Sequence, residues 1–355
     1  MSFLTFSDLE MTYPDGTHAV KGINAEIEKG EFIVLLGPSG CGKTTTLRMI
    51  AGLEIATAGS ISMDTVDSTN LRPGDRDIGF VFQFYALYPH MSVKENILFP
   101  LVSAGIPKDE ANKRLLELAK RLGLTDMLKR KPTQLSGGDQ QRVSLARAMI
   151  RNPKFYLMDE PLGTLDADRR QEMAEYIKQQ QIEMAVTTIY VTHDQEEAMS
   201  LADRIIVMKD GLIQQIGKPN DVYDNPANLF VANFVGSPGM NQLKGSVSEK
   251  DGQLFLKAEN SDCSVTLTEN VKPGDEVVLG IRSEFIHADK NGDLEGTVTM
   301  NEYQGAYRII HMETGFGNII MRADASADYQ LEEKIMLSFN PQHTRLFDTV
   351  SGELI

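Results

Sequence analysis

The octapeptide GPSGCGKT at residues 37–44 constrains the fold of this chain more than any other feature. It follows a wholly apolar run, residues 32–36, and precedes a helical pattern over about residues 43–51. Glycines let successive backbone N–H groups face one anion, and a helix N-terminus adds partial positive charge. We therefore expect a phosphate-binding loop, with Lys43 reaching the terminal phosphates and Thr44 ligating Mg²⁺.

A second chemical signal is a pair of carboxylates at the end of an apolar run. Residues 155–158 read as a buried strand, and Asp159 and Glu160 follow it directly. A buried pair of acids without a cation would be costly. We expect Asp159 to hold the Mg²⁺ shell near the phosphate loop, and Glu160 to act as general base toward the attacking water.

A third signal, LSGGDQQ at residues 135–141, opens another helical pattern. The hydroxyl of Ser136 and the bare amides of Gly137 and Gly138 at a helix start form a second anion site. A helical insert would hold this site away from the first within one chain. Two chains placed head to tail would bring the two sites to one nucleotide.

The apolar runs indicate how the chain is organised. Five of them alternate with helical patterns, which predicts a largely parallel sheet covered by helices; they lie at residues 32–36, 78–82, 155–158, 188–192 and 205–208. Residues 86–151 read as an inserted helical subdomain, and short alternating strands begin near residue 241. We expect an α/β domain over residues 1–235 and an all-β domain of one or two compact barrels over residues 236–355.

Composition excludes several classes of protein. A chain of 355 residues with 41% hydrophobic content suits two domains, and no apolar run approaches the roughly 18 residues of a spanning helix. Residues 1–13 lack the pattern of a signal peptide, and two cysteines suit a reducing cytoplasm. The net charge of −15 argues against nucleic acid as a partner. We expect contact with a membrane only through a protein partner.

Cys41 lies inside the phosphate loop, at a helix N-terminus, where a thiolate is favoured. We therefore expect a thiol alkylator to inactivate the protein and Mg-ATP to protect it.

Together these motifs resemble those of the ATP-binding cassette (ABC) ATPases over the whole chain. The motifs that carry the resemblance, in order, are the loop at 37–44, Gln83, LSGGDQQR at 135–142, Asp159-Glu160, LDA at 165–167 and Thr192-His193-Asp194. The sequence is most similar to sugar-importer ATPases, including relatives for glycerol phosphate and polyols. The further matches are GEF at 30–32, SPGMN at 237–241 and GIRSE at 280–284.

The resemblance implies a role for each site residue. Tyr13 would stack on adenine; Gln83 would touch Mg²⁺ and the catalytic water; His193 would contact the γ-phosphate and orient Glu160. The implied catalytic set is Lys43, Gln83, Glu160 and His193, and the implied Mg²⁺ ligands are Thr44, Gln83 and Asp159. ATP would be contacted by Tyr13, Gly37, Pro38, Ser39, Gly40, Cys41, Gly42, Lys43, Thr44 and Thr45 of one chain and by Ser136, Gly137, Gly138 and Asp166 of another.

The resemblance also implies partners and a location. The chain would be a peripheral ATPase subunit on the cytoplasmic face of the inner (plasma) membrane, coupled to two membrane-spanning permease subunits and indirectly to an extracytoplasmic solute-binding protein. Its C-terminal domain, OB-like and of the TOBE type, would stabilise the dimer or receive a regulator. The solute would be a sugar, polyol, glycerol or glycerol phosphate; a polyamine or iron importer is the alternative. A non-transport ABC clamp and a purely regulatory protein are alternatives of another class, disfavoured by the complete catalytic set and by the lack of a long coiled-coil insert or second cassette.

Two short segments depart from the family pattern. Asp139 stands where Gln is usual, and Gly163-Thr164 stand where Ser-Asn is usual. Both lie in segments that, by the resemblance, face the opposite subunit's nucleotide, where an extra carboxylate would repel phosphate. We therefore hypothesise a partner ATPase that is not identical to this chain; a homodimer with neutral variation at these positions is the alternative.

Overall fold

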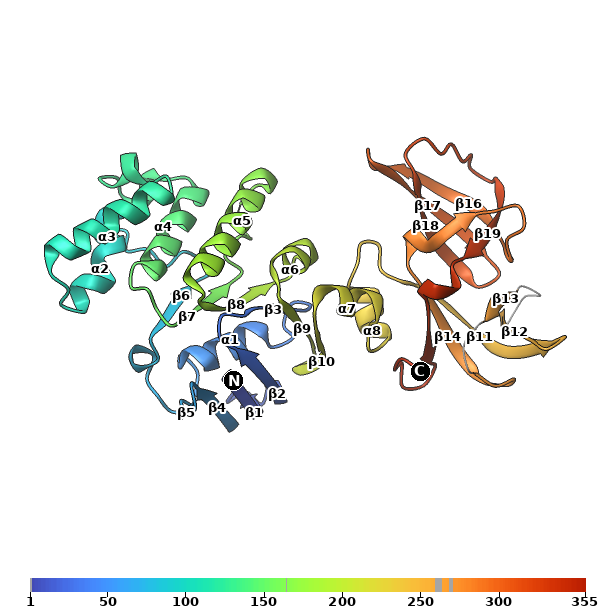
Figure 1. Cartoon of the computed structure of the whole chain (residues 1–355), viewed down its shortest axis with the longest axis horizontal. Coiled ribbons are helices and arrows are strands. Elements are labelled where there is room, and N and C mark those ends of the chain that lie inside the picture. Colours follow the sequence, from blue (N-terminus) through green and yellow to red (C-terminus); the bar gives the residue numbers. More distant parts are fainter. Residues whose placement is uncertain (1, 164, 259–263, 268–270) are drawn as a thin grey trace. The chain divides into compact units, whose positions relative to one another are not determined.

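The computed structural model describes residues 2–163, 165–258, 264–267 and 271–355. The chain divides into two compact units, residues 1–219 and 220–355 (Figure 1). None of the described helices combines the length and the hydrophobicity needed to cross a membrane.

The first unit is built around a six-stranded sheet in the order β10-β9-β3-β8-β7-β6. Its strands are β3 (Phe32–Leu36), β6 (Ile78–Val81), β7 (Phe155–Asp159), β8 (Thr187–Thr192), β9 (Arg204–Lys209) and β10 (Leu212–Gly217). All pairs are parallel except β9 with β10. Every residue of β3, β7 and β8 is buried, as expected for parallel strands covered on both faces. The expected α/β architecture is confirmed.

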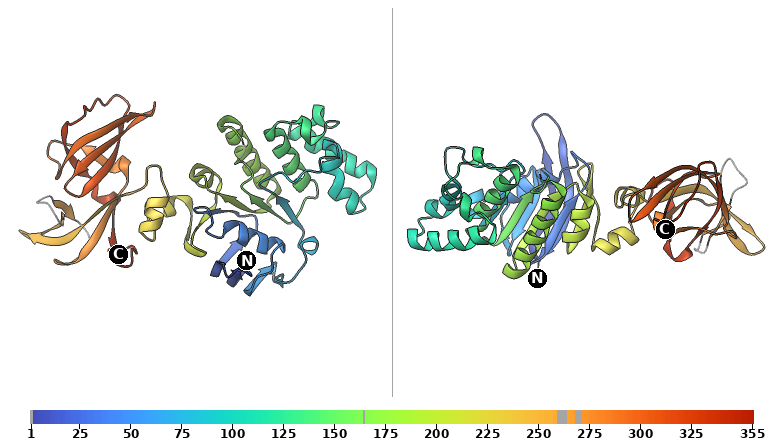
Figure 2. Two further views of the ribbon diagram at one scale, coloured as in Figure 1. Left: turned by 180° about the vertical axis from the view of Figure 1, so that it is seen from behind. Right: turned by 90° about the horizontal axis from the view of Figure 1, so that it is seen from above.

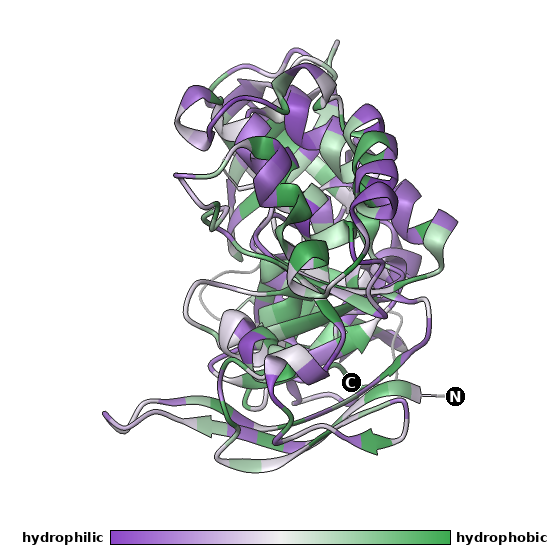
Figure 3. Cartoon of the chain, turned by 90° about the vertical axis from the view of Figure 1, so that its left-hand side faces the viewer, coloured by the Kyte–Doolittle hydropathy of each residue, from purple (hydrophilic) through white to green (hydrophobic). Residues whose placement is uncertain are grey.

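A four-stranded antiparallel sheet, in the order β2-β1-β4-β5, lies against this core. It consists of β1 (Ser2–Thr12), β2 (His18–Glu28), β4 (Ala58–Met63) and β5 (Val66–Asp67). Side chains of β1, β2, β3 and β7 share one hydrophobic cluster with α1 (Lys43–Ala51). In Figure 1, α1 and this sheet lie on one side of the parallel strands, and α5 (Ala167–Met184) and α6 (Gln195–Leu201) lie on the other. In Figure 3, hydrophobic residues predominate in the central strands, whereas the helices around them carry both hydrophilic and hydrophobic residues.

The segment between β6 and β7 contains α2 (Val93–Ser103), α3 (Lys108–Arg121) and α4 (Gly137–Met149), and all its regular structure is helical. Figure 2 shows α2 and α3 beyond the β6 edge of the sheet. Ser92 and Glu95 form a reciprocal capping box at the start of α2, which fixes where that helix begins. Short 3-10 helices lie within this segment at Thr125–Met127 and Pro132–Gln134, and outside it at Pro73–Asp75, Ser283–Phe285 and Pro341–His343.

In its described residues, the second unit is all β apart from two of these 3-10 helices and two short α-helices, α7 (Pro219–Asp224) and α8 (Leu229–Phe234). Its two five-stranded sheets have the orders β13-β12-β11-β14-β20 and β15-β19-β16-β17-β18 and share one hydrophobic core. The strands are β11 (Asn241–Lys250), β12 (Gln253–Ala258), β13 (Ser264–Leu267), β14 (Glu276–Ile281), β15 (Ile286–Ala288), β16 (Leu294–Tyr303), β17 (Tyr307–Thr314), β18 (Gly317–Asp324), β19 (Lys334–Phe339) and β20 (Thr344–Asp348). The expected all-β C-terminal domain is confirmed.

The expected boundary after residue 235 falls inside this second unit. Leu229 and Ala232 of α8 pack with Met240, Val278 and Phe347 of the β structure. Residues 220–235 therefore fold with the β unit, although their sequence pattern is helical.

Arg282, the centre of the GIRSE motif, ties these helices to the sheet. Its guanidinium is 2% exposed and donates to the carbonyl oxygens of Tyr223 (2.7 Å), Ala232 (3.2 Å) and Val235. It also stacks 3.9 Å from the centre of the Tyr223 ring, whose hydroxyl donates to Glu284 at 2.6 Å. The GIRSE motif thus supplies both the cation, Arg282, and the acceptor, Glu284, that hold the α7–α8 segment.

Candidate functional site

The phosphate loop lies between β3 and α1, where its glycines are required by close backbone contacts. A Cβ on Gly37 would lie 2.3 Å from the carbonyl oxygen of Met208 and 2.7 Å from Sγ of Cys41. Gly42 has φ +103°, and a Cβ there would lie 2.5 Å from the carbonyl oxygen of Ala19. Only glycine fits either position without displacing backbone, so the spacing of the octapeptide follows from packing as well as from anion binding.

Lys43 is a buried cation within this loop. It is 5% exposed, and Nζ donates to the carbonyl oxygens of Gly37 at 2.7 Å and Pro38 at 2.9 Å. It forms no ion pair with a carboxylate in the part of the chain that the structure describes. A buried ammonium whose partners are two carbonyl oxygens and the sulfur of Cys41 (3.8 Å) is a fitting counter-charge for a phosphate group held against the same backbone.

Thr44 and Asp159 form the neighbouring oxygen pair. Thr44 Oγ1 donates to Oδ1 of Asp159 at 2.9 Å, and Asp159 is the buried last residue of β7. Burial raises the pKa of Asp159; the adjacent Glu160 charge adds to the rise, and the Thr44 hydrogen bond and the Arg48 and Lys43 charges oppose it. The Asp159 carboxylate, with too little positive charge around it, and the Thr44 hydroxyl are two neighbouring oxygen donors. Such a donor set fits Mg²⁺, which prefers oxygen ligands completed by water and phosphate.

Glu160, Gln83 and His193 meet at the same edge of the sheet. They follow β7, β6 and β8, which are adjacent and parallel, so their carboxyl ends converge. Gln83 Nε2 donates to Oε2 of Glu160 at 2.8 Å, and Nδ1 of His193 lies 3.4 Å from Oε1. The carboxylate is thus held from both sides.

The backbone at Glu160 is unusual. Its φ is +44°, in the left-handed region, and its N–H donates to the carbonyl oxygen of Val191 at 3.0 Å. A side chain larger than glycine adopts this geometry at a cost, and such strain is concentrated at functional positions. The turn directs the carboxylate toward Gln83 and His193 rather than along the strand.

The predicted second anion site lies at the start of α4. Ser136 is the N-cap, and its Oγ both accepts from the N–H of Asp139 at 3.2 Å and donates to Oδ2 of Asp139 at 2.8 Å. Asp139 also pairs with Arg142. Burial raises the pKa of Asp139, but these hydrogen bonds oppose the rise and hold the pKa below its ordinary value. Within the described ranges, no hydrogen bond joins Gly137 or Gly138 to the phosphate loop.

Tyr13 and Asp166 complete the predicted set. Tyr13, half-buried beside α1, lies with its hydroxyl 3.2 Å from Oγ1 of Thr45. Asp166 is the N-cap of α5, and its largely exposed side chain pairs with Arg169 at 3.5 Å. A Cβ on Gly163 would make only an ordinary contact, so packing does not explain that departure; Thr164 lies outside the described residues.

The expectation of a thiolate at Cys41 is wrong. The side chain is 2% exposed, and burial raises the pKa of the thiol, although the nearby Lys43 charge opposes the shift. The helix N-terminus does not offset the loss of hydration, so Cys41 acts as a small buried side chain against Gly37.

Arg147, which the sequence patterns did not single out, connects α4 to the segment after Gln83. Its guanidinium donates to the carbonyl oxygens of Tyr85 (2.9 Å) and Ala86 (2.7 Å), two residues with φ of +49°. Ser144 adds a hydrogen bond to Tyr85 at 2.9 Å. The available signal was an arginine among apolar residues on the buried side of a predicted helix.

Comparison with known families matches three parts of the chain. Residues 20–163 match the family described as ABC transporter. Residues 236–286 match the MalK OB fold domain, and residues 279–347 match the TOBE domain. The two units of the structure therefore correspond to an ATPase cassette and to OB-like C-terminal domains.

Similar proteins extend over nearly the whole chain. The chain is 43% identical to the sn-glycerol-3-phosphate import ATP-binding protein UgpC of Psychromonas ingrahamii, over 100% of this chain and 96% of the relative. It is 44% identical to the oligosaccharides import protein MsmX of Bacillus subtilis (98% of each) and 44% identical to the trehalose/maltose import protein MalK of Thermococcus litoralis (95% of each).

Solved structures resemble the first unit. A dimeric ATP-binding cassette, MJ0796, bound to ADP and Pi, has a TM-score of 0.57 and 36% identity, covering 61% of this chain and 98% of that one. The structure of cbiO1 from Clostridium perfringens, part of the ABC transporter complex cbiONQ, has a TM-score of 0.58 and 32% identity, covering 62% of this chain and 90% of that one. Motifs, fold and full-length relatives agree, and the chain belongs to the ABC transporter family, among the ATP-binding subunits of carbohydrate and glycerol-phosphate importers.

Proposed function

We propose that this chain hydrolyses ATP with Mg²⁺ to drive uptake of a sugar, polyol, glycerol or glycerol phosphate. The observation that carries the proposal is the convergence of Gln83, Glu160 and His193 next to a phosphate loop with an uncompensated buried lysine. The solute class rests on the names of the import proteins to which the chain is similar.

The phosphate end of ATP would lie over residues 37–45. Lys43 would exchange its two carbonyl partners for phosphate oxygens, while Tyr13 would stack against the adenine. Thr44, Asp159 and Gln83 would hold Mg²⁺. When bound, that ion neutralises charge on the β- and γ-phosphates.

Glu160 would accept the proton of the attacking water. Its two oxygens are already positioned, one by the amide of Gln83 and the other by the ring of His193. A fixed carboxylate at hydrogen-bond distance of a water accelerates hydrolysis through proton transfer and through orientation. Gln83 and His193 would keep the carboxylate aimed at the water without accepting its proton.

A second ATPase chain would complete each site. Ser136, Gly137 and Gly138 lie at the start of α4, and the side chain of Asp166 is exposed. Among the described residues, none of these four forms a hydrogen bond to the phosphate loop of its own chain. They would contact the nucleotide of a partner placed head to tail. Asp139 would then face the partner's nucleotide, where its charge would oppose phosphate. The partner could be an identical or a non-identical ATPase chain, and co-purification of the intact transporter distinguishes the two.

The permease subunits would dock next to Gln83. A cleft of about 700 Å³ there is lined by Phe80, Phe82, Tyr88, Phe99 and Arg147. Phe84, next in sequence to Gln83, is 79% exposed. An aromatic cleft with a cation at its edge suits a short helix of a membrane protein. This docking would place the chain on the cytoplasmic face of the inner membrane, and the external solute-binding protein would act through the permease.

Glu160→Gln tests the proposal, because it keeps the shape of the side chain and removes the base. We expect turnover to fall by about 10²-fold or more, while ATP binding persists, measured by steady-state hydrolysis and by nucleotide-dependent dimerisation. Glu26→Gln, on an exposed position of β2, is the control and should match the wild type. Undiminished turnover in Glu160→Gln would show that Glu160 is not the general base and would refute the proposed mechanism.

A further inference from the structure

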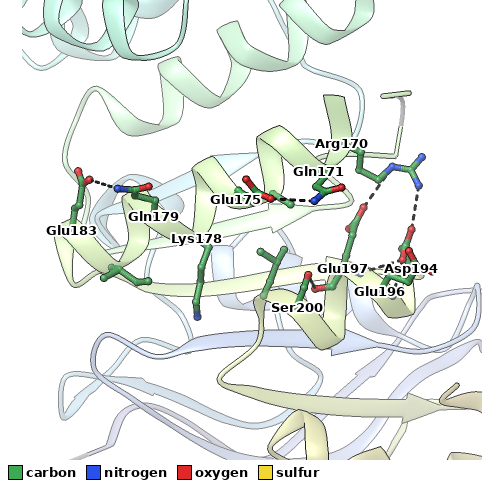
Figure 4. A pocket seen from close by; sticks show the side chains of 13 residues that line it. Arg170, Gln171, Glu175, Lys178, Gln179, Glu183, Asp194, Glu196, Glu197 and Ser200 are labelled. Atoms are coloured by element: carbon green, nitrogen blue, oxygen red, sulfur yellow. Dashed lines mark hydrogen bonds and ion pairs between the residues drawn. The ribbon is translucent and has the colours of Figure 1, made fainter. Parts of the chain in front are cut away.

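A groove of about 750 Å³ separates α5 from α6, and Arg170 closes one end of it (Figure 4). Arg170 is not among the residues assigned above to nucleotide or metal. It lies four residues after Asp166, on the first turns of α5. Figure 4 shows its guanidinium reaching from α5 toward Asp194 and Glu197.

One guanidinium contacts three residues in two segments of the chain. Nη2 donates to the carbonyl oxygen of Leu165 at 3.1 Å, and Nη1 donates to Oδ2 of Asp194 at 3.1 Å. Nε has no hydrogen-bond partner among the described residues, but it lies 3.8 Å from Oε1 of Glu197. Leu165 directly precedes Asp166, and Asp194 directly follows His193.

Glu197 provides the fixed end of this arrangement. It is buried, and its Oε2 accepts from the hydroxyls of Tyr190 (2.7 Å) and Thr192 (2.9 Å), both on β8. Burial raises the pKa of Glu197, while these two hydrogen bonds and the Arg170 charge oppose the rise. Oε1 is left facing Arg170, and the guanidinium is the cation that compensates the buried carboxylate.

Asp194 links the same residues to the start of α6. It is the N-cap, its Oδ1 accepts from the N–H groups of Glu196 and Glu197, and its own N–H donates to Oγ1 of Thr192 at 3.0 Å. The backbone on the C-terminal side of His193 is therefore fixed to β8 and to Arg170 together. His193 itself lies 3.4 Å from Glu160.

From these contacts we propose that Arg170 is a positioning residue, which couples the segment carrying Asp166 to the segment carrying His193. The proposal rests on the proposed function, in which Asp166 faces the partner's nucleotide and His193 serves its own. A displacement of Asp166 by the partner's nucleotide then moves Leu165, the guanidinium and Asp194, and so changes the distance from His193 to Glu160. Arg170 touches neither nucleotide, so it transmits the state of one site to the other.

The test compares kcat with KM in the full-length chain. We expect Arg170→Met to lower kcat about tenfold to a hundredfold, with the KM for ATP within about twofold of the wild type, because residues 37–45 are untouched. Lys178→Met is the matched control: Lys178 also lies on α5 and lines the same groove, but it pairs with Asp203 at 2.9 Å, which belongs to neither segment. The control should keep the wild-type kcat.

A second variant separates positioning from folding, because Arg170→Met alone leaves the Glu197 carboxylate buried without its cation. Arg170→Met with Glu197→Gln removes both charges and should restore the thermal midpoint to that of the wild type. The proposal expects kcat to remain low in this double variant; recovery of kcat together with the midpoint would overturn it, as would a single variant indistinguishable from Lys178→Met. A wild type without ATP turnover would instead refute the proposed function.

Discussion

Arg282→Met is a direct test of how the C-terminal unit is held together. Methionine fills a similar volume but removes every donor, so the carbonyl oxygens of Tyr223, Ala232 and Val235 lose their partners. Each hydrogen bond from a charged group contributes about 1.5–3 kcal/mol. The sum overstates the loss, because burial lowers the pKa of Arg282 and removing that buried charge returns part of the cost. A net loss of about 3 kcal/mol remains.

That loss should be visible as heat sensitivity of the second unit. The unit spans residues 220–355, which is 136 residues, and for a domain of this size about 1 kcal/mol shifts the thermal midpoint by roughly 4 °C. We therefore expect a fall of about 10 °C in the transition of the C-terminal unit, followed by circular dichroism. Hydrogen exchange should accelerate over residues 219–235, which lose their attachment to the sheet.

The matched control is Arg322→Met. Arg322 also lies 3.9 Å from a tyrosine ring, that of Tyr307, and it is exposed on β18. It should change the midpoint by less than about 2 °C. If Arg282→Met left both the midpoint and the exchange of residues 219–235 unchanged, the three carbonyl contacts would not be holding these helices.

Three further predictions concern the ATPase unit. Burial raises the pKa of Asp159, so this carboxylate binds a proton more tightly in the folded state than in the unfolded state. The nucleotide-free protein should therefore lose stability as pH rises above the ordinary carboxyl range. Asp159→Asn should raise the thermal midpoint at pH 7 and abolish Mg-ATP hydrolysis, and a lower midpoint would contradict this. Cys41 should react with iodoacetamide at least about tenfold more slowly than free cysteine at neutral pH, with a rate that climbs as pH rises, followed by mass spectrometry of its peptide. Asp139→Gln should release the Ser136 hydroxyl and lower the KM for ATP by about fivefold, the effect of roughly 1 kcal/mol at a helix N-terminus; an unchanged KM would show that the carboxylate does not oppose phosphate.

The sequence predicted which side chains meet at one edge of the sheet, because its signals there are local. The buried strands before Gln83, Asp159 and His193 are adjacent and parallel, so their ends had to converge once the sheet formed. The glycines of the phosphate loop were equally readable, since positive φ and close contacts leave few other residues possible.

What could not be predicted depends on contacts between distant segments. Arg282 binds carbonyl oxygens 47 to 59 residues away, and carbonyls carry no mark in the sequence. The same dependence holds for Arg170, whose partner Asp194 lies 24 residues away at the N-cap of another helix. Cys41 misled the prediction because its position at a helix N-terminus is visible in the sequence, whereas its burial is not.

The left-handed backbone at Glu160 has a consequence for laboratory evolution of this protein. Holding a side chain at φ +44° costs the native state on the order of 1–3 kcal/mol, and glycine or asparagine would relieve much of it. A library screened only for thermal resistance would thus enrich replacements at the residue that we propose as the general base. Stabilised variants of this chain need a parallel screen for turnover, because the most accessible gain in heat resistance lies where activity would be lost.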